Sequence, residues 1–171
     1  MPYAPENAQD RKFLDLAIAH SRRSLTDGST KKPFGAVVVV DGDVVGEGAN
    51  SVVEACDPTA HAEVVALRDA GRRLGTYLME NGTLYSSSEP CPMCLVACYW
   101  AGIPRLVYGA TSHDAAVNGH EDLRFYRELA LPNAERRMLD EVAVDGAPRS
   151  AAVDVLAAWA AAQPGPVEPK F

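Results

Sequence analysis

Apolar positions along the chain follow two different spacings, and these separate predicted helices from predicted strands. In residues 6–26 the apolar positions recur every three or four residues, the spacing of one helical face, and Gly28 follows as a stop signal. Residues 36–40 and 44–49 are rich in valine and flank an Asp-Gly-Asp sequence. Valine-rich runs joined by Asp-Gly predict a β-hairpin. The chain is therefore expected to open with a helix and to continue into two strands of a sheet.

Helices and strands are predicted to alternate through the rest of the chain. The predicted elements are a helix that carries His61 and ends near Arg73, a strand at 83–86, a helix at 92–101, a strand at 105–109, short helices at 121–130 and 150–162, and a strand at 141–144. Strands that alternate with helices of this length predict an α/β fold. We expect a mixed sheet of about five strands with helices packed on both faces.

One domain is predicted for most of the chain. Its 171 residues suffice for one sizeable core and are few for two. We predict a single domain over residues 1–163. Residues 164–171 contain three prolines, which remove backbone donors and fix an extended path, and they end in Phe171. This last segment is therefore predicted to be an extended tail.

The composition is that of an ordinary globular protein, and its charge disfavours nucleic acid as a partner. Hydrophobic residues make up 47% of the chain and charged residues 23%, with 16 basic and 23 acidic residues giving a formal net charge of -7. A protein that grips a phosphate backbone usually carries the opposite sign. No apolar run approaches the roughly 20 residues that span a bilayer, and the N-terminus is too polar for a secretory signal. We therefore expect a cytoplasmic protein with no membrane partner.

Residues with the chemistry of a zinc site stand at the predicted starts of two helices. His61 and Glu63 follow Thr59, which is the expected N-cap of the first of these helices. Cys91 and Cys94 are three residues apart, so their sulfurs share one face at the start of the second helix, where thiolates are favoured. One imidazole and two thiolates leave a fourth zinc position open for water, which is the mark of a catalytic zinc. Glu63 is then a candidate proton carrier.

Two further cysteines bear on whether such a zinc site would be catalytic or closed. Cys98 lies about two helical turns, or ~10 Å, beyond Cys91, which is too far for a common metal, so we interpret it as a small buried hydrophobe. Cys56 precedes His61 by a short loop and stays open as a fourth ligand. A closed site would indicate a zinc-stabilised binding module without turnover. A thiol-disulfide oxidoreductase would use the paired cysteines but would have no use for the imidazole and the carboxylate.

The combination of His-x-Glu with Pro-Cys-x-x-Cys resembles the signature of zinc nucleobase deaminases. From about Phe13 to the C-terminus the chain resembles the cytidine-deaminase-like superfamily and, within it, the small bacterial guanine deaminases. The matching segments are Pro33-Phe34-Gly35-Ala36-Val37, Asn50, Asp57-Pro58-Thr59-Ala60-His61-Ala62-Glu63, Glu89-Pro90-Cys91-Pro92-Met93-Cys94, Tyr99-Trp100-Ala101 and Asp114-Ala115-Ala116. The resemblance implies a three-layer α/β/α fold and a Zn²⁺ cofactor on His61, Cys91 and Cys94. It also implies a hydrolase of purine metabolism that converts guanine to xanthine and ammonia.

The same resemblance implies roles for residues around the metal. Glu63 is expected to be the proton shuttle and Asp122 the second catalytic carboxylate, with the neighbouring Glu121 as the alternative. The substrate contacts that it implies are Phe34, Asn50, the backbone of Ala62, Trp100 and Phe171. Members of the family form homodimers that exchange C-terminal segments, so Phe171 is expected to close the active site of a partner chain.

Two positions depart from the guanine deaminases that the chain resembles. Phe171 ends the chain where a tyrosine is expected, and His120 stands where an aromatic ring is expected. A site built to hydrogen-bond its substrate discriminates strongly, so losing one polar group can redirect its specificity. Guanosine, cytosine, an aminotriazine and adenosine in tRNA are the alternative substrates, and the acidic charge argues against tRNA.

Overall fold

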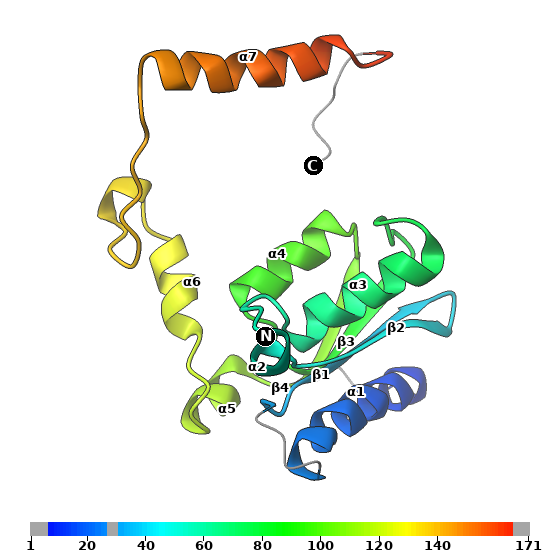
Figure 1. Ribbon diagram of the computed structural model, residues 1–171. Coiled ribbons are helices and arrows are strands. Elements are labelled where there is room, and N and C mark those ends of the chain that lie inside the picture. The colour runs from blue at the N-terminus through cyan, green and yellow to red at the C-terminus, as the bar shows by residue number, and fades with distance from the viewer. Residues whose placement is uncertain (1–6, 27–30, 166–171) are drawn as a thin grey trace. The chain divides into compact units, whose positions relative to one another are not determined.

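The computed structural model describes residues 7–26 and 31–165, and the chain divides into two compact units after Ala130 (Figure 1). The first unit holds the sheet and the helices α1 to α6, and the second holds a 3-10 turn and the helix α7. Among the described residues, no helix is both long and apolar enough to cross a membrane.

A four-stranded mixed sheet forms the centre of the first unit. Its order is β2-β1-β3-β4, with β1 antiparallel to both β2 and β3 and with β3 parallel to β4. The strands are β1 (Gly35–Val40), β2 (Asp43–Ala49), β3 (Gly82–Ser88) and β4 (Arg105–Ala110). Asp41 and Gly42 both have positive φ, 52° and 87°, in the turn that joins β1 to β2. The predicted hairpin is thereby confirmed, since two such residues form its favoured tight turn.

The prediction of a fifth strand at residues 141–144 is wrong. The segment lies in the second unit, its residues are exposed, and it has no regular structure. The alternation of Val142 and Val144 resembles a strand in sequence. A strand must nevertheless place its N–H and C=O groups against a neighbouring strand, and these residues are not part of the described sheet.

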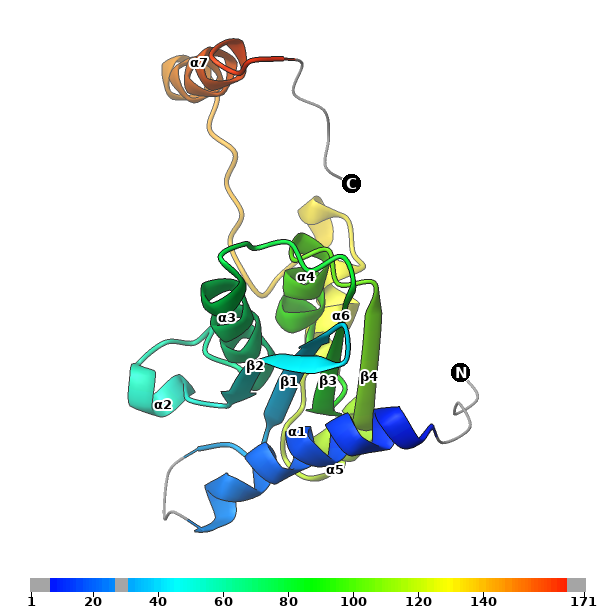
Figure 2. The same cartoon turned by 90° about the vertical axis from the view of Figure 1, so that its right-hand side faces the viewer.

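Helices cover both faces of the sheet, which confirms the predicted layers (Figure 2). α1 (Ala8–Thr26) lies on one face, and α3 (Ala62–Leu74) and α4 (Pro92–Trp100) lie on the other. Successive residues of β1 point to opposite faces. Ala36 and Val38 therefore join the core under α3 and α4, while Val37 and Val39 join the core under α1.

The close approach of α3 to β2 depends on two glycines. A Cβ added to Gly48 would lie 2.1 Å from the carbonyl oxygen of Ala62, and one added to Gly46 would lie 2.3 Å from that of Ala66. Any side chain at either position would push the helix off the sheet. The first turn of α3, which carries the candidate site, is therefore set at its depth by these glycines.

Shorter helices complete the two units. They are α2 (Val52–Ala55), α5 (Ser112–Val117), α6 (Leu123–Leu129), a 3-10 turn at Asn133–Glu135 and α7 (Ala147–Ala161). α6 and α7 confirm the helices predicted at 121–130 and 150–162. α2 and α5 were not predicted, because four and six residues are too few to show a helical repeat.

Candidate metal centre and catalytic site

His61 ends an extended loop and serves as the N-cap of α3. Its backbone is extended, with φ -68° and ψ 155°, and the helix begins at Ala62. The prediction that Thr59 is the N-cap is wrong. Asp57 accepts hydrogen bonds from both the backbone N–H and the hydroxyl of Thr59, at 2.8 and 2.6 Å, so the threonine is held in the loop.

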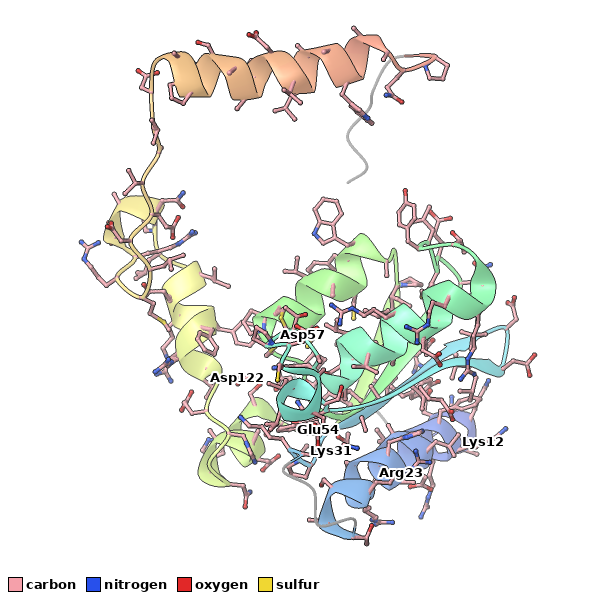
Figure 3. All side chains as sticks on the ribbon, viewed as in Figure 1. Lys12, Arg23, Lys31, Glu54, Asp57 and Asp122 are labelled. Carbon is pink, nitrogen blue, oxygen red and sulfur yellow. The ribbon has the colours of Figure 1, made fainter. Side chains whose placement is uncertain are left out.

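Arg68 anchors this loop to the body of α3. Its guanidinium donates to Asp57 Oδ2 at 3.1 Å and to Thr59 Oγ1 at 3.0 Å (Asp57 in Figure 3). The two hydrogen bonds from Thr59, followed by the one from Arg68, lower the pKa of Asp57. His61 N–H in turn donates to Thr59 O at 2.8 Å, so these hydrogen bonds hold the loop that carries the imidazole against α3.

The two candidate thiol ligands stand at the start of α4. Cys91 is its N-cap with an extended backbone, Pro92 occupies the first turn, and Cys94 lies one turn further and is buried. The Cys91 and Cys94 sulfurs are 3.6 Å apart, and Cys91 Sγ is 3.6 Å from His61 Nδ1. All three ligand atoms lie within 4.8 Å of one another.

These separations fit a tetrahedral zinc ion. With Zn–S bonds of about 2.3 Å and Zn–N bonds of about 2.0 Å, a tetrahedron separates two sulfurs by about 3.8 Å and a sulfur from a nitrogen by about 3.5 Å. Hydrogen bonding to Cys94, and then to His61, lowers the pKa of the Cys91 thiol to about 4. The same contact with Cys91, and then burial, raises the pKa of Cys94. A cation bound between the sulfurs would replace the remaining proton.

The other two cysteines lie outside this group of ligand atoms. Cys98 is buried in the core under α3 and α4, and burial raises its pKa to about 12. Cys56 is exposed at the end of α2, where its thiol donates to the carbonyl of Val53 at 3.7 Å. The described residues that gather for a metal are therefore three, with neither Cys56 nor Cys98 as the fourth.

Glu63 places a buried carboxyl group beside the three ligand residues. It lies in the first turn of α3, it is 5% exposed, and its Oε1 accepts a hydrogen bond from Ser86 Oγ at 2.9 Å. Burial raises the pKa of Glu63. A carboxyl group whose pKa is moved toward neutrality can both accept and return a proton at physiological pH, as general acid-base catalysis requires.

A cavity of about 260 Å³ opens in front of these groups. This volume lies just below the range of roughly 300–1,000 Å³ typical of ligand pockets, so it suits a small ligand. The residues that line it are Lys32, Phe34, Asn50, His61, Glu63, Ser88, Glu89, Cys91, Ala115, Gly119, His120, Glu121, Asp122 and Phe125. Most of the residues predicted to form the site thus share one cavity.

Asn50 and a pair of rings form one side of the cavity. Asn50 is buried at the end of β2, where its N–H donates to Phe34 O at 3.0 Å and its Oδ1 accepts from Val52 N–H at 3.5 Å. The rings of Phe34 and His120 meet edge to face, with centroids 5.1 Å apart. Burial, and then the charge of Lys32, lowers the pKa of His120, so its imidazole is neutral at neutral pH.

Asp122 brings a second carboxylate to the cavity from the start of α6 (Figure 3). Its Oδ1 is buried and has no hydrogen-bond partner among the described residues. Burial, and then the charge of Cys91, raises the pKa of Asp122. The adjacent Glu121 is exposed, and its Oε1 accepts from Arg124 N–H at 3.3 Å. Asp122 is therefore the carboxylate with an oxygen available for a ligand.

Comparison with known proteins identifies the family. The cytidine and deoxycytidylate deaminase zinc-binding region matches residues 7–110. The chain belongs to this deaminase family. A guanine deaminase from Bacillus subtilis (strain 168) is 50% identical over 124 residues, which cover 72% of this chain and 79% of the relative. An X-ray structure of guanine deaminase from Bacillus subtilis has a TM-score of 0.84 and 37% identity, and it covers 95% of this chain and 99% of that chain.

A second group of relatives has another substrate. A tRNA-specific adenosine deaminase from Buchnera aphidicola subsp. Schizaphis graminum (strain Sg) is 38% identical over 110 residues, which cover 64% of this chain and 72% of the relative. The family that matches is described by its zinc-binding region, and His61, Cys91 and Cys94 of this chain form a group that could hold such an ion. The protein is therefore a zinc-dependent aminohydrolase with the cytidine-deaminase-like fold.

Among the described residues, two of the predicted substrate contacts, Trp100 and Ala62, do not bring their side chains to the deaminase cavity. Trp100 is 63% exposed and lines a separate apolar groove between α3 and α4. The methyl group of Ala62 is buried in the core, although its backbone N–H stands in the first turn of α3, where N–H groups lack helical partners. Phe171 lies outside the described residues.

Sequence reasoning missed several residues that line the cavity, among them Lys32, Ser88, Glu89 and Phe125. Glu89 carried a signal, because it directly precedes the Pro-Cys-x-x-Cys motif. Phe125 reads in sequence as one more apolar position of a short helix. Lys32 sits in a polar stretch with no motif, so its place beside the site follows only from the fold.

Proposed function

We propose that this deaminase acts on a free aminopurine and converts guanine to xanthine and ammonia. The unpaired buried oxygen of Asp122 supports this substrate most directly. A carboxylate accepts hydrogen bonds, and guanine presents ring and amino N–H donors on one edge. Cytosine and adenine lack the ring N–H on the corresponding edge. The 50% identity to a guanine deaminase agrees with this choice.

The reaction is a hydrolysis at the ring carbon that bears the amino group. A C–O bond forms with a water molecule, the C–N bond breaks, and the amine leaves as ammonia. Zinc held by His61, Cys91 and Cys94 would act as the Lewis acid that activates this water. Glu63 takes the first proton of the water and passes it to the neighbouring ring nitrogen. It then carries the second proton, from the hydroxyl now bonded to the ring carbon, to the departing amine.

The remaining cavity residues would orient the ring. The buried amide of Asn50 lines the cavity, and the backbone N–H of Ala62, in the first turn of α3, lacks a helical partner, so both would offer hydrogen bonds along one edge. Phe34, edge to face with His120, provides an apolar wall for the flat purine. Asp122 holds the N–H groups on the remaining edge. Each of these substrate roles is our proposal.

A substrate panel with released ammonia as the readout tests the proposal. The panel contains guanine, guanosine, cytosine, an aminotriazine and a tRNA anticodon stem-loop with adenosine. We expect guanine to give the highest kcat/KM, because a cavity of about 260 Å³ is small for a nucleoside. Faster turnover of any other member would refute guanine as the substrate. Turnover of the stem-loop would place the protein with its tRNA-specific relatives instead.

The protein is further proposed to work as a homodimer that exchanges C-terminal segments. Val153, Val155, Leu156 and Trp159 of α7 are all about half exposed or more, which is costly for a helix of a lone chain. The first unit leaves apolar side chains exposed as well, in the groove that Trp100 lines. A second copy of the chain would cover such surfaces on both molecules. Each domain of residues 1–163 would then be completed by contacts with the partner chain, and the tail would carry Phe171 to the partner's cavity.

The proposal also includes a cytoplasmic location and a small-molecule substrate. Thiol ligands stay reduced in the cytoplasm, which supports a cytoplasmic location. The formal net charge of -7 supports a small-molecule substrate and disfavours nucleic acid.

A further inference from the structure

Residues 111–130, here called the α5–α6 segment, carry both Asp122 and His120 to the cavity. Apolar packing does little to hold this segment, because Ser112 is the one residue within it that is buried. The Asp122 side chain makes no capping hydrogen bond with its own helix, and its Oδ1 is unpaired. The position of its carboxylate therefore depends on where the backbone of the segment is held.

Two hydrogen bonds tie the segment to the dipeptide that precedes Cys91. Glu89 Oε2 accepts from the backbone N–H of Ser112 at 2.8 Å, and Tyr126 Oη donates to the carbonyl of Pro90 at 2.7 Å. Ser112 precedes Asp122 in the chain, and Tyr126 follows it. The segment is thus fastened on both sides of Asp122 to the residues that lead into a metal ligand.

We propose that Glu89 and Tyr126 are positioning residues that set the distance between the Asp122 carboxylate and the metal centre. Glu89 holds the backbone N–H of Ser112 within the segment, and the Tyr126 side chain holds the segment to the backbone carbonyl of Pro90. Glu89 also lines the cavity, and Tyr126 is not among the residues that line it. Burial raises the pKa of Tyr126, so its hydroxyl stays a donor at physiological pH. A displacement of about 1 Å in a catalytic group is enough to cost much of its effect. This inference rests on the proposed role of Asp122 in deamination.

A double-mutant cycle separates positioning from plain structural support. Tyr126→Phe removes one hydroxyl and is made both in the wild-type protein and in Asp122→Asn. If Tyr126 acts through Asp122, the change should lower kcat/KM about tenfold in the wild type and less than about twofold in Asp122→Asn. The zinc content should be the same in all four proteins. An equal loss in both backgrounds would overturn the proposal.

Binding supplies a second readout in case the Asp122→Asn proteins turn over too slowly to measure. The affinity of xanthine, the proposed product, is measured by calorimetry in the same four zinc-loaded proteins. Tyr126→Phe should weaken xanthine binding where Asp122 is present and leave it unchanged in Asp122→Asn. Weakening of equal size in both backgrounds would again overturn the positioning role.

Glu89 allows a test by conservative rescue. Glu89→Gln keeps an oxygen that accepts from Ser112 N–H, so it should retain most of the activity, whereas Glu89→Ala should lose about tenfold. If glutamine is as poor as alanine, the charge of Glu89 matters in the cavity and its positioning role is wrong. Tyr99→Phe and Glu54→Gln change exposed residues of α4 and α2 and serve as matched controls without effect.

Failure of this inference and failure of the proposed function give different results. If the wild-type protein does not deaminate guanine, the guanine proposal fails, and the same cycle is measured with the substrate that the panel identifies. The positioning role fails only when the loss from Tyr126→Phe does not depend on Asp122.

Discussion

Ser86 on β3 donates a hydrogen bond of 2.9 Å from its Oγ to Oε1 of Glu63 on α3. Both residues are buried, at 0% and 5% exposure, and so the bond joins the sheet to the helix directly behind the metal centre. A hydrogen bond between two buried partners holds a side chain in one orientation. Glu63 therefore points to the cavity with little freedom, as a proton shuttle between water and substrate requires.

Replacing Glu63 with glutamine should abolish most turnover and leave the metal in place. Glutamine has nearly the same shape and can still accept from Ser86, but it cannot take up a proton. Turnover should fall by at least the ~10²–10⁴-fold typical of general acid-base groups. Zinc content measured on the same sample should stay at about one ion per chain. Undiminished turnover would refute the role of Glu63.

The hydrogen bond from Ser86 gives a companion variant. Ser86→Ala leaves the carboxylate in place and removes its fixed donor, so we expect a smaller loss, about tenfold in kcat. Ser88→Ala, at the end of the same strand, is not a neutral comparison because Ser88 lines the cavity. Ser51→Ala, before α2, is the better control.

The two cysteine ligands should differ sharply from the other two cysteines in their effect on zinc retention. Cys91→Ala and Cys94→Ala should lose zinc, because two remaining ligands hold the ion poorly. Cys56→Ala and Cys98→Ala should retain it, since neither sulfur lies in the ligand group. Zinc is measured by elemental analysis after gel filtration. Loss of zinc from Cys56→Ala would mean a closed four-ligand site, which is incompatible with the proposed reaction.

The two neighbouring acidic residues at the start of α6 provide a matched pair. Asp122→Asn should lower kcat/KM by about 10²-fold, since an amide at this position can present an N–H instead of accepting one. Glu121→Gln should cost much less, because Glu121, although it lines the same cavity, is exposed and its Oε1 already accepts from the Arg124 N–H of its own helix. If Glu121→Gln proves the more damaging, the second carboxylate has been misassigned.

The two cysteine ligands could be predicted from sequence because their geometry is local: Cys91 and Cys94 lie three residues apart in the first turn of α4. Their pairing with His61, 30 positions away, was predicted from the resemblance to the deaminase signature. The exact helix start was missed, since nothing in the sequence shows that Asp57 captures Thr59. Whether the Thr59 side chain caps the helix or bonds within the loop is decided by a third residue, here Arg68, which donates to both Asp57 and Thr59.

Residues that reach the site through the fold were harder to predict. The role of Trp100 beside the substrate was inferred from the resemblance to guanine deaminases, yet its side chain lines the apolar groove between α3 and α4 and not the deaminase cavity. Tyr126 contacts Pro90 across 36 positions in the chain, a pairing that no local pattern indicates. Long-range contacts of this kind depend on how α6 packs against the rest of its unit, and the helical spacing of its residues does not determine that packing.

His120 should add its own component to the pH profile, beside those of the Glu63 and Asp122 carboxyl groups, whose pKa values are raised. Burial and Lys32 lower its pKa, so the ring is neutral at neutral pH and takes up a proton only as the pH falls below its usual value of about 6.5. The charged ring would then have to be desolvated when substrate binds. His120→Phe keeps the edge-to-face contact with Phe34 and cannot titrate.

The ratio of kcat/KM between wild type and His120→Phe isolates this effect from proton binding at the metal ligands. The ratio should be constant above pH 7 and should fall as the pH drops below about 6. His113 is an exposed histidine outside the cavity, so the ratio of kcat/KM between wild type and His113→Gln should not change with pH. A flat ratio for His120→Phe as well would show that His120 does not titrate in the substrate cavity.

Exchange of the C-terminal tail can be tested by mixing two inactive chains. The first lacks residues 167–171 and keeps Glu63, and the second is full-length with Glu63→Gln. If Phe171 closes the partner's cavity, a hybrid dimer holds one complete site, in which Glu63 of the first chain is covered by the tail of the second. Deamination should then return on co-expression to a substantial fraction of the wild-type rate. If each tail folds over its own cavity, every site lacks either Glu63 or Phe171, and the mixture stays as inactive as its parts.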